Sequence, residues 1–281
     1  MCPSGRVELA TLRTVVRIHP SPQYFTMKNS IQKHIRQVEE RIAQACQRAG
    51  RDTSKITVVL ATKTVEPEHI LEAAKHGYRI VGENRIKEAR RKIEQMGDRA
   101  HDLEWHYIGH MQSNKVNKVV PVVSMVQSID RMKIVKKMNC RLKKLDKTMD
   151  VLIQVNTSGE DSKYGIAPAD AIRFVEKTAE YDRLKIKGLM TIGLFSDDWP
   201  RVRAGFRQLR ELRDQIAGQG IDRVEMRHLS MGMTNDFELA IEEGATIIRV
   251  GRAIFGERDK PDSYYWPGID SATYSPGKSI K

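Results

Sequence analysis

The sequence predicts a single α/β domain folded as a (β/α)8 TIM barrel. Eight short runs of β-branched and other apolar residues indicate buried strands, and helix-like segments separate them. Strands that alternate with helices form βα units whose strands run parallel. Eight such units within residues 27–259 match the number and length expected of a barrel. A doubly wound open sheet, which uses the same units, is the main alternative.

The first predicted element is an amphipathic helix over residues 27–49, and Gly50 ends it. Its apolar residues recur at spacings of three and four, which places them on one helix face. They are Ile31, Ile35, Val38, Ile42 and Ala45. Residues 1–26 contain three arginines, three prolines and scattered Ser and Thr, and we expect them to form a disordered N-terminal extension.

The remaining elements alternate along the chain. Strands are expected at residues 56–61, 79–81, 104–108, 122–126, 151–155, 186–191, 224–228 and 246–250. Helices are expected from about Pro67 and at residues 85–95, 113–119, 131–145, 168–181, 199–216 and 235–243. The tail, residues 260–281, is rich in Pro, Gly, Ser and Tyr without periodicity, so it is expected to be irregular.

The composition limits the classes of function. The chain has 48 Lys and Arg against 36 Asp and Glu, and its net charge of +12 favours anionic ligands. Basic runs such as Arg90-Arg-Lys92 lack interleaved aromatic residues and are interpreted as solvated helix faces, so no nucleic acid partner is expected. Three widely separated cysteines favour a reducing compartment and a cytoplasmic location. No apolar run approaches the roughly 20 residues of a membrane span.

In a barrel, functional groups gather where the strands end, at the carboxyl face. Lys63 directly follows the first expected strand, within Leu-Ala-Thr-Lys-Thr-Val. A partly desolvated amine loses its proton more readily and can form a Schiff base with an aldehyde. Taken alone, Lys63 is better interpreted as a solvated loop lysine, the commoner situation for this residue type.

Two further loops carry polar candidates. Asn84, after the second strand, offers an amide to a ligand, although it could equally cap the following helix. His106 and His110 are four residues apart, but His106 falls within a strand and no third ligand follows at a suitable spacing. No metal site is therefore predicted, and His110 is a candidate pocket residue.

The loops after the last two strands, residues 228–236 and 249–256, are rich in small residues. Barrels frequently bind phosphate groups with these two loops. The predicted phosphate-binding residues are Ser230, Gly232, Met233, Gly251 and Arg252. A Schiff-base lysine on one side and phosphate loops on the other predict a cofactor that carries both an aldehyde and a phosphate, which is pyridoxal 5'-phosphate (PLP).

Several motifs, in order along the chain, resemble those of the pyridoxal phosphate homeostasis protein family. They are Ala61-Thr-Lys-Thr-Val65, Gly82-Glu-Asn-Arg85, residues 106–115, residues 155–156 with 163–165, Leu229-Ser-Met-Gly-Met233 and Arg249-Val-Gly251. The resemblance implies a single barrel of the alanine racemase N-terminal type. It also implies that Lys63 forms the internal aldimine and that Arg249 faces the pyridine nitrogen. Thr234 stands where a serine is expected, and its hydroxyl retains the same chemistry.

The resemblance implies that the protein takes part in intracellular PLP homeostasis, binding the cofactor and delivering it to apo-enzymes, with no established reaction and no assigned catalytic residue. Because the guanidinium of Arg249 keeps its proton, the ring nitrogen would stay unprotonated and the cofactor would be a weak electron sink. The alternative is an amino acid racemase or lyase on the same lysine. Racemases of this fold add a second domain, for which residues 260–281 leave no room, and a monomer is expected.

Overall fold

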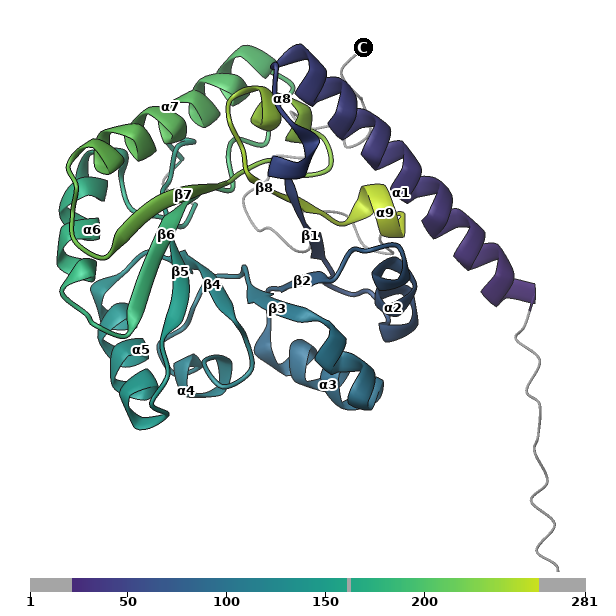
Figure 1. The fold of residues 1–281 in the computed structure, drawn as a ribbon, viewed down its shortest axis with the longest axis horizontal. Coiled ribbons are helices and arrows are strands. Elements are labelled where there is room, and N and C mark those ends of the chain that lie inside the picture. Colours follow the sequence, from purple (N-terminus) through teal and green to yellow (C-terminus); the bar gives the residue numbers. More distant parts are fainter. Residues whose placement is uncertain (1–21, 161–162, 258–281) are drawn as a thin grey trace, which may run out of the picture.

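The strands close into a parallel barrel (Figure 1). The computed structural model describes residues 22–160 and 163–257. Neighbouring strands pair in chain order, and β8 pairs with β1, which excludes the open sheet and confirms the (β/α)8 barrel. The strands are β1 (Thr57–Ala61), β2 (Ile80–Glu83), β3 (Glu104–Tyr107), β4 (Met125–Ile129), β5 (Met149–Gln154), β6 (Leu184–Met190), β7 (Val224–Ser230) and β8 (Ile247–Val250).

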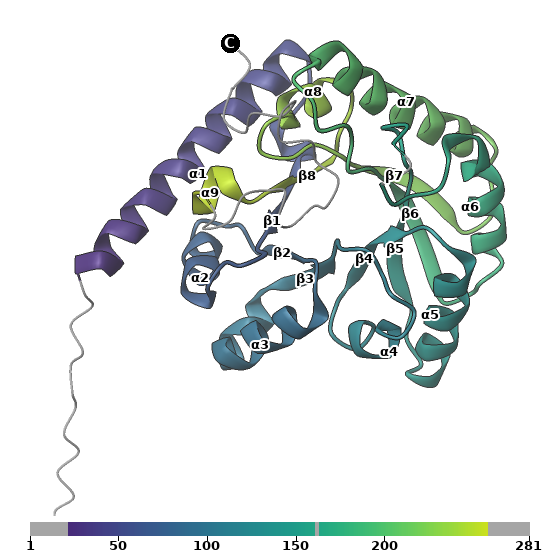
Figure 2. The same cartoon turned by 180° about the vertical axis from the view of Figure 1, so that it is seen from behind.

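Helices surround the barrel in both views (Figures 1 and 2), and α1 lies along α8 and α9. The α-helices are α1 (Pro22–Arg48), α2 (Pro67–Lys75), α3 (Ile86–Met96), α4 (Val116–Val119), α5 (Met132–Lys144), α6 (Ala171–Ala179), α7 (Trp199–Gly218), α8 (Phe237–Glu242) and α9 (Arg252–Phe255). Short 3-10 helices span Thr53–Lys55, Gly97–Asp102 and Pro168–Asp170.

Helix α1 begins five residues before its predicted start, so residues 22–26 are helical rather than disordered. A proline at the first helical position lacks only an N–H that would have no partner within the helix, which is why Pro22 does not prevent the helix. The predicted apolar face is buried against the barrel. The rest of the predicted extension and the tail at 260–281 lie outside the described residues.

Apolar side chains form two layers, one inside the barrel and one between strands and helices. The inner cluster comprises Val59, Met125, Leu152, Met190 and Ile247. The outer cluster is larger and includes Phe206 and Phe237, both fully buried. Strands buried on both faces require nearly continuous apolar sequence, and this explains why the strands could be recognised from the sequence.

Strand β4 lies three residues beyond its predicted position of 122–126. The N–H groups of Val122 and Val123 donate to Val119 O at 2.8 and 3.3 Å, so this β-branched pair forms the turn after α4 instead of a strand. Strand β4 then continues through Gln127 and Ser128, which are fully buried. Polar side chains therefore enter the barrel interior.

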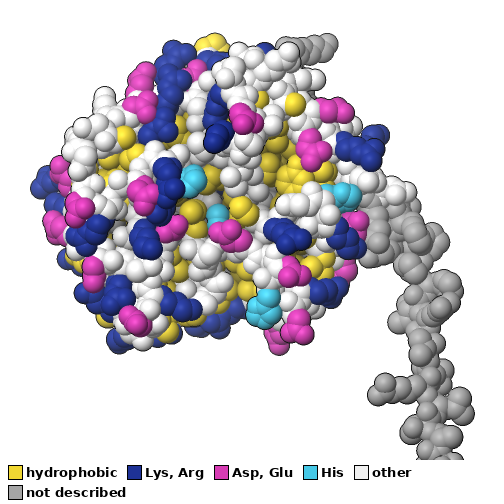
Figure 3. Space-filling view, in the orientation of Figure 1, with side chains coloured by type: hydrophobic (Ala, Val, Ile, Leu, Met, Phe, Trp, Pro, Cys, Tyr) yellow, Lys and Arg dark blue, Asp and Glu magenta, His cyan; other side chains and the backbone are white. Residues whose placement is uncertain are grey.

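The surface carries mixed charge. On the face shown in Figure 3, Lys and Arg side chains lie among Asp and Glu rather than in one basic area. Several are paired, as where Arg203 and Arg210 contact Glu243 at 3.2 and 2.8 Å. Within residues 22–160 and 163–257, no helix is both long enough and apolar enough to cross a bilayer.

Candidate functional site

Lys63 lies just beyond β1, at the carboxyl end of the barrel, and is only 8% exposed. The next residue, Thr64, has φ of 64°, a left-handed conformation that is costly for a β-branched residue. Its N–H donates to Glu88 Oε1 at 2.6 Å, a contact that holds the turn. This contact therefore holds the backbone next to Lys63 in place.

A second lysine, Lys92 of α3, supports the same turn and is fully buried. Its ammonium group donates to Thr62 O at 2.6 Å, Glu83 Oε1 at 2.5 Å and Glu88 Oε1 at 2.9 Å. Burial raises the pKa of Glu83, and the charge of Lys92 acts in the opposite direction. All three protons of this ammonium are used to join β1, β2 and α3 next to Lys63. The interpretation of Lys92 as part of a solvated basic run was wrong.

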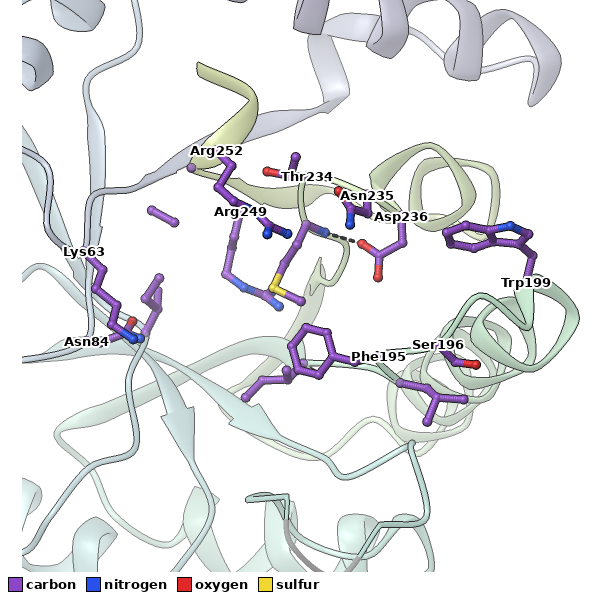
Figure 4. A pocket seen from close by; sticks show the side chains of 16 residues that line it. Lys63, Asn84, Phe195, Ser196, Trp199, Thr234, Asn235, Asp236, Arg249 and Arg252 are labelled. Atoms are coloured by element: carbon purple, nitrogen blue, oxygen red, sulfur yellow. Dashed lines mark hydrogen bonds between the residues drawn. The ribbon is translucent and has the colours of Figure 1, made fainter. Parts of the chain in front are cut away.

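Asn84 follows β2 and lies beside Lys63 in Figure 4. It does not cap helix α3, because the N-cap residue is Arg85 and no side chain caps the helix. Gly109 packs closely against Asn84: a Cβ at position 109 would lie 2.4 Å from the carbonyl oxygen of Asn84. Glycine at this position therefore allows Asn84 to remain next to the lysine.

Arg249 lies on β8, the strand that pairs with β1, and its side chain points into the cavity that Lys63 also lines (Figure 4). Its guanidinium donates to Ser230 Oγ at 2.8 Å and to Thr191 O at 2.7 Å. Burial lowers the pKa of Arg249 to about 10, and the nearby Asp236 acts in the opposite direction. The group is therefore a cation at neutral pH, held in one orientation.

From Arg249 a chain of hydrogen bonds crosses the barrel interior. Ser230 Oγ donates to Gln127 Oε1 at 2.7 Å, and Gln127 Nε2 lies 2.9 Å from His106 Nδ1. Because the amide nitrogen can only donate, His106 Nδ1 is the acceptor, and His106 Nε2 donates to Glu104 Oε1 at 2.8 Å. Ser230, predicted to bind phosphate, thus serves this chain and does not line the cavity.

The loop after β7 forms the far side of the cavity. Met233 N–H donates to Asp236 Oδ1 at 2.6 Å, so this amide, predicted to bind phosphate, already has a partner within the loop. Gly232 has φ of 89°, and a Cβ there would lie 2.6 Å from Ala240 Cβ. Gly232 does not line the cavity and instead allows the loop to pack against α8.

Three contacts connect this loop to its surroundings. Arg249 N–H donates to Gly232 O at 3.0 Å, and Ala253 N–H donates to Thr234 Oγ1 at 3.4 Å, which joins the loops after β7 and β8. From helix α1, Arg41 donates to Thr234 O at 2.8 Å. The hydroxyl predicted to be important at Thr234 therefore links the two loops.

The cavity between these groups has a volume of about 90 Å³. Six predicted residues line it: Lys63, Asn84, Met233, Arg249, Gly251 and Arg252. The residues missed from the sequence are mainly those after β6, namely Ile192, Leu194, Phe195, Ser196 and Trp199. Their position after the carboxyl end of a strand was a usable signal, but four of the five are apolar and suggested no chemistry.

A second cavity adjoins the first and shares Lys63, Asn84, Ile108 and Ile192 with it. His110 lines this second cavity, and its ring stacks on Tyr164 with centroids 3.5 Å apart. Burial lowers the pKa of His110, although Asp130 acts in the opposite direction. In the part of the chain that the structure describes, no three His, Cys, Asp or Glu side chains are grouped to hold a metal ion.

Asp236 provides a test of the loop's electrostatics. Burial raises its pKa to about 6, against the effect of the Met233 N–H. A carboxyl whose pKa is higher in the folded state stabilises the fold fully below about pH 4 and loses that contribution as pH rises through about 6. We expect the wild type to lose up to ~3 kcal/mol relative to Asp236→Asn between pH 4 and 7. Urea unfolding at each pH measures this, and a constant difference between the two proteins would contradict it.

The barrel and its site define the class of protein. The family model described as "Alanine racemase, N-terminal domain" matches residues 34–259, so the chain is a barrel of this class. A solved structure of an unknown protein from Bifidobacterium adolescentis is 40% identical, with a TM-score of 0.78, and the match covers 82% of this chain and 96% of that one.

The particular family follows from two named relatives. The pyridoxal phosphate homeostasis protein of Aquifex aeolicus is 44% identical over 226 residues, which are 80% of this chain and 97% of the relative. The PipY protein of Synechococcus elongatus, solved with PLP bound, is 30% identical with a TM-score of 0.69, and covers 77% of this chain and 99% of its own. The chain belongs to the pyridoxal phosphate homeostasis protein family.

Proposed function

We propose that the chain binds PLP in the cavity between Lys63 and the loops after β7 and β8, and that it acts in PLP homeostasis. The observation that carries this proposal is the buried Lys63 side chain in a cavity that Arg249 and Arg252 also line (Figure 4). These groups suit an aldehyde, a pyridine nitrogen and a phosphate. Relatives named for PLP homeostasis, and one solved with PLP, support it.

Each residue has a distinct role in this proposal. PLP supplies an aldehyde that amines attack reversibly, and Lys63 Nζ would hold it as a Schiff base. Arg249, fixed by Ser230 and Thr191, would donate a hydrogen bond to the ring nitrogen and leave that nitrogen without a proton of its own. Because an unprotonated ring stabilises carbanions poorly, the site favours holding the cofactor over racemase or lyase chemistry.

The phosphate would be held mainly by the loop after β8. Gly251 and Arg252 line the cavity, and the guanidinium of Arg252 can supply charge-assisted hydrogen bonds to a phosphate. Asn84 and Met233 would contact the ring from either side, and His110 would lie next to the site rather than in it. The phosphate role of Ser230 is not retained, because its hydroxyl contacts Arg249 and Gln127.

Absorbance spectra and covalent labelling test this proposal. Wild-type protein mixed with PLP is expected to develop a visible absorbance band, and borohydride reduction is expected to fix the label on the peptide that contains Lys63. Lys63→Ala is expected to lose both signals, because Lys63 is the one lysine among the described residues that line this cavity. Lys118→Ala, at an exposed position of α4, is the matched control. A persistent visible band in Lys63→Ala, or a label on another lysine, would contradict the proposal.

We further propose that the protein is a cytoplasmic monomer that delivers PLP to apo-enzymes. Tyr164 is the one large apolar side chain exposed among the described residues, so little apolar surface is offered to a permanent subunit contact. Cys46 and Cys140 are free thiols, in keeping with a reducing compartment. Light scattering would test the monomer, and reactivation of an apo-enzyme by the loaded protein would test delivery.

A further inference from the structure

A second cavity lies at the mouth of the barrel beside Lys63, and the proposed PLP binding gives it no role. Its volume is about 380 Å³, within the range of roughly 300–1,000 Å³ that is typical of small-molecule sites. It is lined by Lys63, Asn84, Arg85, Ile86, Lys87, Tyr107, Ile108, Gly109, His110, Gln112, Lys115, Gln154, Tyr164 and Ile192. Most of these residues do not reach the first cavity.

The Lys, Arg, Asp and Glu side chains that line this cavity are all of the basic kind. Four of its lining residues are lysine or arginine and none is aspartate or glutamate. Among the ion pairs formed by the described residues, none involves Arg85, Lys87 or Lys115. A concave surface lined by cations concentrates the electric field and attracts anions.

The other lining groups suit an organic molecule better than an inorganic ion. His110 and Tyr164 form a stacked pair of rings at one wall, with 19° between the ring planes, and Ile108 and Ile192 supply apolar surface. Burial raises the pKa of Tyr107 to about 12, so its phenol keeps its proton, which it donates to His110 O at 3.4 Å, and the ring adds no negative charge to the cavity. An anion with a short carbon chain would contact both the cations and the apolar wall.

We propose that this cavity binds a small carboxylic acid, such as an α-amino acid, with its carboxylate paired to Arg85 and Lys115. The proposal deepens the proposed function and rests on it for the role of Lys63: an amino acid bound here would bring its amine into the cavity where the cofactor-bearing lysine lies. No bond is made or broken on binding. The guanidinium of Arg85 offers a carboxylate two parallel hydrogen bonds, which favours this anion geometrically.

The test uses the full chain without added PLP, so that it does not depend on the cofactor. Saturation-transfer NMR would be recorded with L-alanine and propanoate, which carry a carboxylate, and with L-alaninamide, which does not. We expect binding of the two acids and at least tenfold weaker binding of the amide. Inorganic phosphate should fail to displace propanoate at equal concentration. Displacement by phosphate would identify a phosphate site and overturn the proposal.

Substitutions inside and outside the cavity test where propanoate binds. Arg85→Gln and Lys115→Gln are each expected to weaken propanoate binding at least fivefold. Lys118→Gln, on helix α4 three residues after Lys115 but outside the cavity, is expected to leave it unchanged. Equal affinity in all three variants, or no propanoate binding by the wild type, would overturn the proposal. A wild type that binds propanoate but develops no visible band with PLP would instead refute the proposed function alone.

Discussion

Lys92→Met is expected to lower the free energy of unfolding by about 3–5 kcal/mol, because it removes one partner of a buried ion pair. Glu83 would remain fully buried, and its carboxylate would keep only the hydroxyl of Thr62 as a donor. Thr62 O and Glu88 would lose the same ammonium. Chemical denaturation measures the effect, and Lys87→Met, at an exposed position of the same helix, should change stability by no more than ~0.5 kcal/mol.

A double variant distinguishes the energy of the Lys92–Glu83 ion pair from the effect of lost packing. Lys92→Met combined with Glu83→Gln removes both charges, so it is expected to be more stable than the two single changes added together predict. Strict additivity would show that the pair is not coupled. PLP affinity should also fall in Lys92→Met, because Thr62 and Thr64 on either side of Lys63 both depend on this cluster.

Gln127→Leu is expected to cost about 2–4 kcal/mol, since two buried polar groups lose their partners at once. The hydroxyl of Ser230 would have no acceptor and His106 Nδ1 would have no donor. Arg249 would then be less firmly oriented, and the visible band with PLP should shift or broaden. A loss below ~0.5 kcal/mol with an unchanged band would show that the chain of hydrogen bonds does not support the site.

Gln127→Glu provides the matched comparison, because it keeps the shape of the side chain. One oxygen still accepts from Ser230, but the other oxygen of an ionised carboxylate can satisfy His106 Nδ1 only if that nitrogen carries a proton. Nitrogen NMR of the imidazole is therefore expected to show both ring nitrogens protonated in the variant. In the wild type, an imidazole that carries its proton on Nδ1 would contradict the donor directions assigned to the chain.

The sequence predicted what depends on local pattern. Apolar runs identified the strands, and the rule that function gathers at their carboxyl ends located Lys63, Asn84 and Arg252. The role of Arg249 came from the family resemblance. Lys92 could not be found in this way, because a lysine in a basic run resembles a solvated one until Glu83 is placed beside it by the fold. Likewise, nothing local distinguishes Ser230 as a partner of Gln127 from Ser230 as a phosphate ligand.

The position of β4 shows a second limit of prediction from sequence, because here a strand was placed on the wrong residues. Val122 and Val123 have the composition of a strand, whereas Gln127 and Ser128 do not, yet the latter pair lies in the barrel. The interior of a barrel accepts polar side chains where they satisfy one another, here through His106 and Ser230. Such compensation depends on residues distant in sequence, so a window of neighbouring residues does not reveal it.

Helix α1 lies outside the barrel, yet Arg41 within it holds Thr234 and Glu238 and stacks over Phe237. We therefore expect that the smallest piece of this chain able to retain PLP is larger than the eight βα units. A deletion variant that starts at β1 would lose the contacts of Arg41 with the loop after β7, although it would keep every residue that lines the cavity. Comparisons of affinity among relatives should accordingly consider the docking of their first helix alongside the residues in the cavity.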